Sequence, residues 1–125
     1  MSGPDLVTGP DVEATTRERT RRRWRVGFGL AVVVHLVVLY WPFSPSTGGL
    51  PIDKVVHAVI FGMVLWAAAD AGLRVGPVAL VLAAHAVLSE LIQHYLLTGR
   101  SGDPADSVAD VTGVVIVTLI LRRRR

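Results

Sequence analysis

Cysteine is absent from this 125-residue sequence, and charge is scarce through its middle. Without cysteine the chain can form no disulfide and offers no thiolate as a nucleophile or metal ligand. Only 18% of its residues are charged, against roughly 25% in an ordinary soluble domain, and 51% are hydrophobic. Because a soluble helical protein of this size needs polar side chains over its whole surface, the composition predicts a membrane protein.

The basic residues gather at the two ends of the chain. Six arginines lie within Arg17–Arg25, and four more form Arg122–Arg125. These arginines flank hydrophobic segments and do not alternate with aromatic residues along a groove. The pattern therefore favours anionic lipids of the cytoplasmic leaflet as their partner, and we expect no nucleic acid.

Four apolar segments predict an all-α fold, an integral membrane four-helix bundle. The predicted transmembrane helices cover residues 26–42, 54–72, 77–97 and 106–121. Each is close to the ~20 residues with which a helix spans a bilayer. We expect residues 1–25 to be a disordered basic cytoplasmic tail, residues 26–121 to form the membrane domain, and residues 122–125 to be a basic cytoplasmic C-terminus.

The distribution of positive charge predicts the orientation of the bundle. Cytoplasmic loops of membrane proteins carry an excess of lysine and arginine. With both termini in the cytoplasm, the terminal arginines and Arg74 lie inside, and only Lys54 and Arg100 lie outside. We therefore expect both the N and the C terminus to be cytoplasmic.

This orientation brings separated polar residues to one extracytoplasmic end of the bundle. They come from the start of the second predicted helix, where Asp53 is the expected N-cap, the end of the third, the following loop and the start of the fourth. The predicted ligand-binding residues are Asp53, Lys54, His57, Glu90, Gln93, Arg100, Asp103, Asp106 and Asp110. Carboxylates at membrane depth need a cationic or hydrogen-bonding partner. A structural alternative is that Arg100, Asp103 and Asp106 only cap the fourth helix and fasten its loop.

Three short motifs together resemble the VanZ-like family of small bacterial membrane proteins. They are Asp53-Lys54-x-x-His57 followed by Phe61, then Glu90-x-x-Gln93, then Arg100-x-x-Asp103-x-x-Asp106 followed by Asp110 and Gly113. One departure is Asp110, where the family usually has asparagine. The resemblance implies a multi-pass protein of the bacterial plasma membrane with a role in the cell envelope. The namesake of the family is associated with resistance to the glycopeptide antibiotic teicoplanin.

Three functions remain open from the sequence. The favoured one is a binding protein for an envelope precursor, a lipid-linked ligand or a partner membrane protein, in which Lys54 and Arg100 engage an anionic group. The second is a membrane enzyme with His57 or Glu90 as general base. The third is a proton pathway, and its candidate residues are His35, His85, Glu90 and Asp110.

Catalytic signatures are missing from the chain, so we expect a binding protein more than an enzyme. There is no nucleophile elbow, no HExxH zinc motif and no glycine-rich phosphate loop. We assign no cofactor and no resident metal. A metal-dependent variant of the enzyme would draw on a subset of Asp53, His57, Glu90, His94 and Asp106. Alanines in the third segment permit close helix approach and a homo-oligomer.

Overall fold

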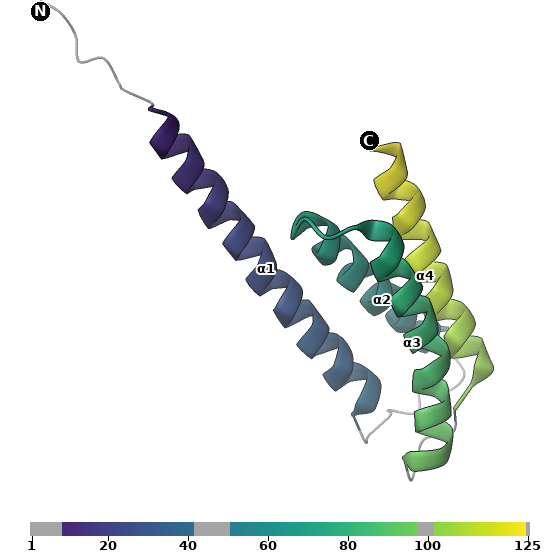
Figure 1. Ribbon diagram of the computed structural model, residues 1–125. Helices are drawn as coiled ribbons and strands as arrows, with labels where there is room; N and C mark the ends of the chain where they lie inside the picture. Colours follow the sequence, from purple (N-terminus) through teal and green to yellow (C-terminus); the bar gives the residue numbers. More distant parts are fainter. Residues whose placement is uncertain (1–8, 42–50, 98–101, 125) are drawn as a thin grey trace, which may run out of the picture.

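The computed structural model describes residues 9–41, 51–97 and 102–124. Within these ranges it contains four helices and no strand. The helices are α1 (Pro10–Tyr40), α2 (Ile52–Asp70), α3 (Val75–Leu96) and α4 (Pro104–Arg123). All four are long and apolar enough to cross a membrane. The predicted all-α membrane bundle is therefore confirmed (Figure 1).

The first helix begins at Pro10, which corrects the prediction of a disordered segment up to residue 25. Proline at the first helical position has a preset φ, and Asp11 and Glu13 lie in the first turn, where the helix dipole favours negative charge. Threonine hydroxyls in this stretch donate to carbonyl oxygens one turn earlier at 2.7 to 2.9 Å. The stretch lacks apolar periodicity, but its alanine, arginine and glutamate residues are good helix formers. Residues 1–8 lie outside the described ranges.

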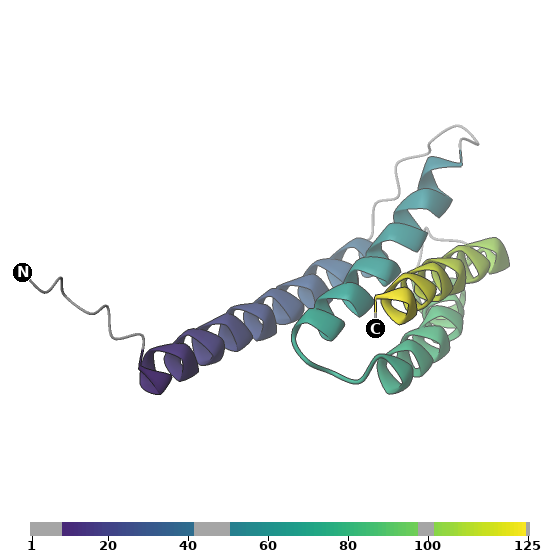
Figure 2. The same ribbon diagram turned by 90° about the horizontal axis from the view of Figure 1, so that it is seen from above.

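The second helix is central to the bundle. It packs against α1, α3 and α4, and α4 also packs against α3. Seen from above, α2 lies between α1 and α4 (Figure 2). The first helix approaches the others toward Tyr40 and diverges from them toward its beginning (Figure 1). Side chains of α2 are therefore in a position to meet partners from every other helix.

The core is small, and most of the apolar surface faces outward. Phe61 and Leu65 of α2 are fully buried, and Leu39 of α1 is nearly so. In contrast, Leu80 and Val81 of α3 are 72% and 67% exposed. Such large apolar surface is uncommon on a soluble monomer, whereas lipid solvates it without penalty. The packing thus fits the membrane environment that the composition predicts.

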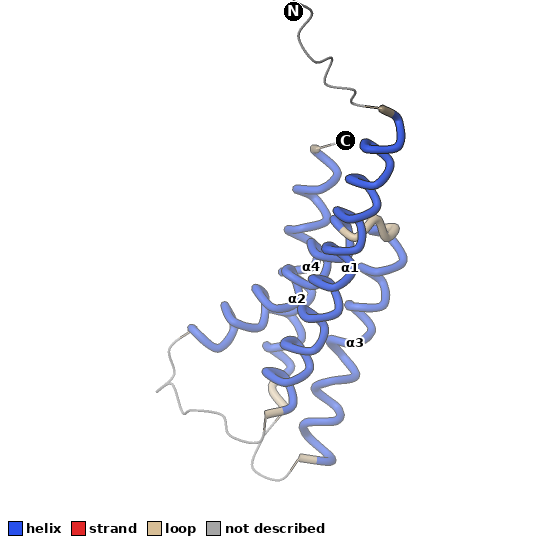
Figure 3. The backbone as a smooth tube through the Cα atoms, turned by 90° about the vertical axis from the view of Figure 1, so that its left-hand side faces the viewer, coloured by secondary structure: helices blue, strands red, loops and turns tan. Residues whose placement is uncertain are grey.

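Two helix ends, one at each end of the bundle, are specified by local sequence. Asp103 is the N-cap of α4, since its Oδ1 accepts a hydrogen bond from the Ala105 amide at 2.9 Å. At the opposite end of the bundle, Gly72 has a φ of 84° and closes α2 in the left-handed conformation that glycine adopts readily. The start of α1 and the end of α4 lie at the same end of the bundle (Figure 3). We call the other end, where α1 and α3 finish and α2 and α4 begin, the polar end.

Candidate functional site

Polar and ionisable side chains from α2, α3 and α4 meet at the polar end. The structure brings together eight of the nine predicted residues, and we refer to them as the polar cluster: Asp53, Lys54, His57, Glu90, Gln93, Asp103, Asp106 and Asp110. The ninth predicted residue, Arg100, lies outside the described residues. Convergence follows from the antiparallel order of the helices, because α3 ends where α2 and α4 begin.

A buried histidine–aspartate pair lies at the centre of the cluster. His57 Nδ1 of α2 lies 2.9 Å from Asp110 Oδ1 of α4, and the two side chains are 4% and 0% exposed. The other ring nitrogen of His57, Nε2, lies 4.0 Å from Asp106 Oδ2. One imidazole ring therefore stands between two carboxylates that are one helical turn apart on α4.

Nearer the surface, Lys54 connects the start of α2 to the start of α4. Its Nζ donates to Asp103 Oδ2 and to Asp106 Oδ1, each at 3.0 Å. Asp106 is buried, whereas Lys54 and Asp103 keep about half of their side-chain surface exposed. Exposed ion pairs contribute little stability, so the Asp106 contact is the stronger constraint on this end of the bundle.

The carboxylate of Asp103 stays charged under ordinary conditions. The Ala105 amide and then the Lys54 ammonium group hold the pKa of Asp103 below its usual value. A lowered pKa means that the folded protein stabilises the charged carboxylate relative to its protonated form. The outer rim of the cluster therefore carries a fixed negative charge beside a fixed positive one.

Glu90 and Gln93 fasten the end of α3 to its neighbours. Glu90 Oε2 accepts a hydrogen bond from the Asp103 amide at 2.8 Å, and Gln93 Nε2 donates to the Leu39 carbonyl oxygen of α1 at 2.9 Å. Both side chains are buried. The spacing of three residues places them on the same face of α3, which is why the Glu90-x-x-Gln93 motif can serve two partners at once.

Glycine allows the backbones to approach closely around this cluster. A Cβ atom on Gly102 would lie 2.6 Å from the Glu90 carbonyl oxygen, and one on Gly113 would overlap the Ala58 backbone. Gly113 belongs to the motif that the sequence singled out, but Gly102 was missed. Its only sequence signal was its position immediately before Asp103.

Two details of the predicted site are corrected by the structure. Asp53 is not the N-cap of α2, because the helix begins at Ile52 after Pro51 and has no side-chain cap. Asp53 instead lies in the first turn, half-buried, close to His57. His94, a candidate metal ligand, is exposed and lies beside the ring of Tyr95, outside the groups of ligating atoms found in the described residues.

Two serines near the cluster were not predicted as site residues from the sequence. Ser89 Oγ of α3 and Ser107 Oγ of α4 both donate to the Ala86 carbonyl oxygen, each at 3.0 Å. The bond from Ser107 ties α4 to α3, whereas the bond from Ser89 lies within α3. Serine at a helix interface is common, so nothing in the sequence distinguished these two from ordinary polar residues.

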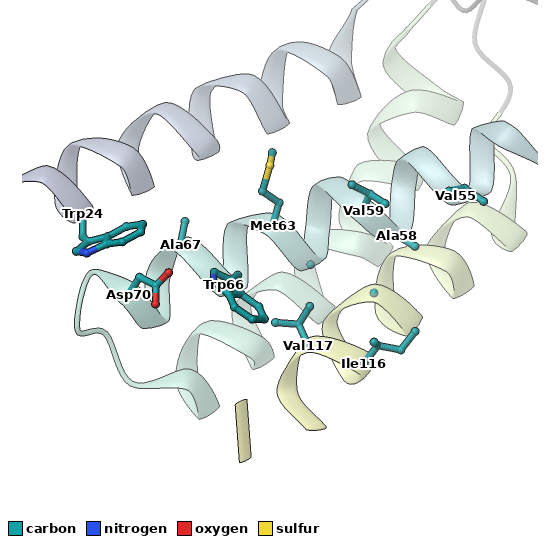
Figure 4. Close-up of a pocket in the computed structure, with 12 residues that line it drawn as sticks. Trp24, Val55, Ala58, Val59, Met63, Trp66, Ala67, Asp70, Ile116 and Val117 are labelled. Carbon is teal, nitrogen blue, oxygen red and sulfur yellow. The ribbon is translucent and has the colours of Figure 1, made fainter. Parts of the chain in front are cut away.

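An apolar groove runs along α2 from the polar cluster toward the opposite end of the bundle. It measures about 660 Å³. Figure 4 shows Val55 at one end of the groove, Met63 in its middle, and Trp24 with Asp70 at the other end. The lining residues include none of the polar cluster, but Val55 follows Lys54 in the chain, so the groove begins within one helical turn of the cluster. The bundle therefore has an apolar groove beside its polar end.

Groups of side chains in the cluster also have the types and proximity that metal ions require. The ligating atoms of His57, Glu90 and Asp110 all lie within 4.8 Å of one another, and the same holds for Asp53, His57 and Asp106. Imidazole combined with carboxylate suits transition metals better than magnesium or calcium.

Four membrane-spanning helices with a polar cluster at one end define the chain as a small multi-pass helical membrane protein. It belongs to the VanZ/LLP1 family, which it matches over residues 8–125. The resemblance that the three motifs predicted is thereby confirmed. No curated protein and no solved structure matches the chain.

Proposed function

We propose that the chain binds a lipid-linked ligand of the bacterial cell envelope on the extracytoplasmic side of the plasma membrane. The acyl or prenyl chain lies in the groove along α2, and the head group contacts the polar cluster. The observation that supports this proposal is that the groove begins at Val55, within one helical turn of Lys54.

The orientation rests on the placement of arginine. The first turns of α1 and the last turns of α4 share one end of the bundle, and both carry exposed arginines (Figure 3). Arginines at that end favour the cytoplasmic side, where anionic lipids attract them. The polar end then faces outward, where envelope precursors are found.

The charges of the cluster select the kind of head group. Carboxylates outnumber cations among its described residues, and Lys54 already has two carboxylate partners. A bare anionic phosphate is therefore a poorer match than the sequence alone indicated. Carboxylates accept hydrogen bonds, so sugar hydroxyls, peptide amides or an ammonium group are the expected contacts.

Glycopeptide resistance follows from the same proposal. A protein that holds a peptide-bearing, lipid-linked precursor competes with an antibiotic for that precursor.

The enzyme alternative rests on the His57–Asp110 pair, since an imidazole that a carboxylate orients is suited to act as a general base. However, Ser89 and Ser107 donate to a backbone carbonyl and not to His57, which favours binding over nucleophilic catalysis.

Filling the groove should weaken lipid binding. We expect Met63→Trp to reduce the affinity for a polyprenyl-linked saccharide–peptide by about tenfold or more, because the indole occupies space that the chain of the lipid needs. Affinity is measured with the purified protein in nanodiscs by native mass spectrometry. The matched control is Leu80→Trp, which places the same side chain on the exposed face of α3 and should leave the affinity unchanged.

Two results would contradict the proposal. One is equal affinity of Met63→Trp and the unmodified protein for the saccharide-bearing lipid. The other is equal binding of phosphatidylglycerol, whose small anionic head group does not use the carboxylates of the cluster.

A further inference from the structure

Three buried side chains from three different helices point ligating atoms toward one space inside the polar cluster. His57 belongs to α2, Glu90 to α3 and Asp110 to α4. Their exposed fractions are 4%, 7% and 0%, and their ligating atoms lie within 4.8 Å of one another. Ligands of one zinc ion lie about 2.0–2.2 Å from it, so these atoms need only small side-chain rotations to share an ion.

One oxygen of each of the two carboxylates lacks a partner. Among the hydrogen bonds of the described structure, Glu90 Oε1 and Asp110 Oδ2 have none, although each is fully shielded from solvent. The second oxygen of each carboxylate is engaged, by the Asp103 amide and by His57 respectively. A buried acceptor without a donor costs about 1–3 kcal/mol, and more when it is charged.

The nearby lysine does not supply a partner for these two carboxylate oxygens. Lys54 lies at the rim and is already bonded to Asp103 and Asp106. Two histidines are the potential cations that act on these carboxylates in the described part of the chain: His57, 2.9 Å from Asp110, and His85, which interacts with Asp110 only through its electrostatic field. Neither imidazole donates a hydrogen bond to Glu90 Oε1 or Asp110 Oδ2, so a divalent cation would neutralise the negative charge that these buried oxygens carry.

We propose that His57, Glu90 and Asp110 bind one divalent transition-metal ion. His57 ligates through Nδ1, with release of any proton held there, and each carboxylate supplies one oxygen. A nitrogen ligand beside two oxygens favours zinc, cobalt or manganese over magnesium and calcium. The sequence placed His57 and Glu90 among the candidate ligands of a metal-dependent enzyme but left out Asp110, which is 53 residues from His57 and meets it only in the folded bundle.

A second group, Asp53, His57 and Asp106, is the weaker candidate. Its atoms also lie within 4.8 Å, and it uses the same imidazole. However, Asp106 already has Lys54 at 3.0 Å, and Asp53 is only half-buried. In the favoured group the ion has three protein ligands, which leaves the fourth position of a tetrahedral ion for water or for a donor oxygen of a bound head group.

The metal itself is the probe in the test. The full chain, purified in detergent and stripped with a chelator, is titrated with Co²⁺, whose visible absorption reports its ligands, and with Zn²⁺ in competition. We expect one ion per chain and displacement of Co²⁺ by Zn²⁺. Glu90→Gln and Asp110→Asn should each weaken binding by at least tenfold, since even loss of an outer partner of a metal ligand costs about 10–100-fold.

His94→Asn is the matched control, because it removes an exposed imidazole on the same helix as Glu90 and should leave the affinity unchanged. Circular dichroism and gel filtration check that each variant stays folded. Absence of saturable Co²⁺ or Zn²⁺ binding would overturn the proposal. So would equal weakening by His94→Asn, or tighter binding of Mg²⁺ or Ca²⁺ than of Zn²⁺. No lipid is added, so this result stands apart from the outcome of the lipid experiment.

Discussion

Replacing His57 with leucine is expected to destabilise the bundle by about 3–5 kcal/mol, because the change leaves the buried Asp110 carboxylate without its side-chain partner. Asp110 is fully buried, and its Oδ1 lies 2.9 Å from His57 Nδ1. Glu90 and Asp106 are also buried nearby. The loss is measured as the free energy of unfolding in mixed micelles with increasing sodium dodecyl sulfate, under metal-free conditions.

The double variant His57→Leu/Asp110→Leu shows whether the destabilisation comes from leaving Asp110 without its partner or from lost packing at His57. Replacing both members of a buried ion pair with apolar groups is often neutral or stabilising. We therefore expect the double variant to recover most of the stability that His57→Leu loses. Additive losses in the double variant would show that the two side chains do not interact.

His35→Leu is the control for removal of a buried histidine. His35 is 2% exposed and lies edge-on to Phe61 with ring centroids 4.4 Å apart. Among the contacts in the described structure, neither of its ring nitrogens has a hydrogen-bond partner. Leucine fills similar volume without an unpaired polar atom, so this variant should be at least as stable as the parent chain.

Gly113→Ala is expected to lower stability by about 1–3 kcal/mol through steric overlap between α2 and α4. A Cβ atom at this position would overlap the backbone of Ala58, and helix backbones cannot yield as a flexible side chain can. Separating the helices there would also draw His57 away from Asp110. The thermal unfolding midpoint in detergent reports the change.

Gly27→Ala is the matched control for this substitution. Gly27 lies in α1, and a Cβ atom there would meet nothing within 4 Å. Alanine is the better helix former, so this variant should be as stable as the parent or slightly more so. Equal thermal unfolding midpoints for Gly113→Ala and the parent chain would mean that α2 and α4 do not approach each other as closely as described.

The sequence was sufficient for the helices and for most members of the polar cluster. Long apolar segments predicted α2, α3 and α4 to within a few residues, because a bilayer demands spans of that length. Antiparallel order then placed the motif residues at one end, and this too is confirmed for the described residues. The start of α1 was missed, since a solvent-exposed helix such as residues 10–25 need not show apolar periodicity.

The side-chain partners within the cluster could not be predicted from the sequence. Spacing grouped Asp53 with His57 on α2, whereas the closest partner of His57 is Asp110 on α4. Which face of α4 meets α2 depends on Gly113 fitting against Ala58, a three-dimensional match that no one-dimensional pattern reports. Lys54 likewise was expected to meet a ligand and instead bonds to Asp103 and Asp106.

The orientation of the polar cluster is open to a direct measurement, because the chain contains no cysteine of its own. Single cysteines are introduced at Ser46, between α1 and α2 in the sequence, at Ser101, between α3 and α4, and at Leu73, between α2 and α3. A membrane-impermeant maleimide applied to intact cells should label Ser46→Cys and Ser101→Cys. It should label Leu73→Cys only after permeabilisation. The reverse pattern would put the polar cluster in the cytoplasm and contradict the proposed role at the outer face of the membrane.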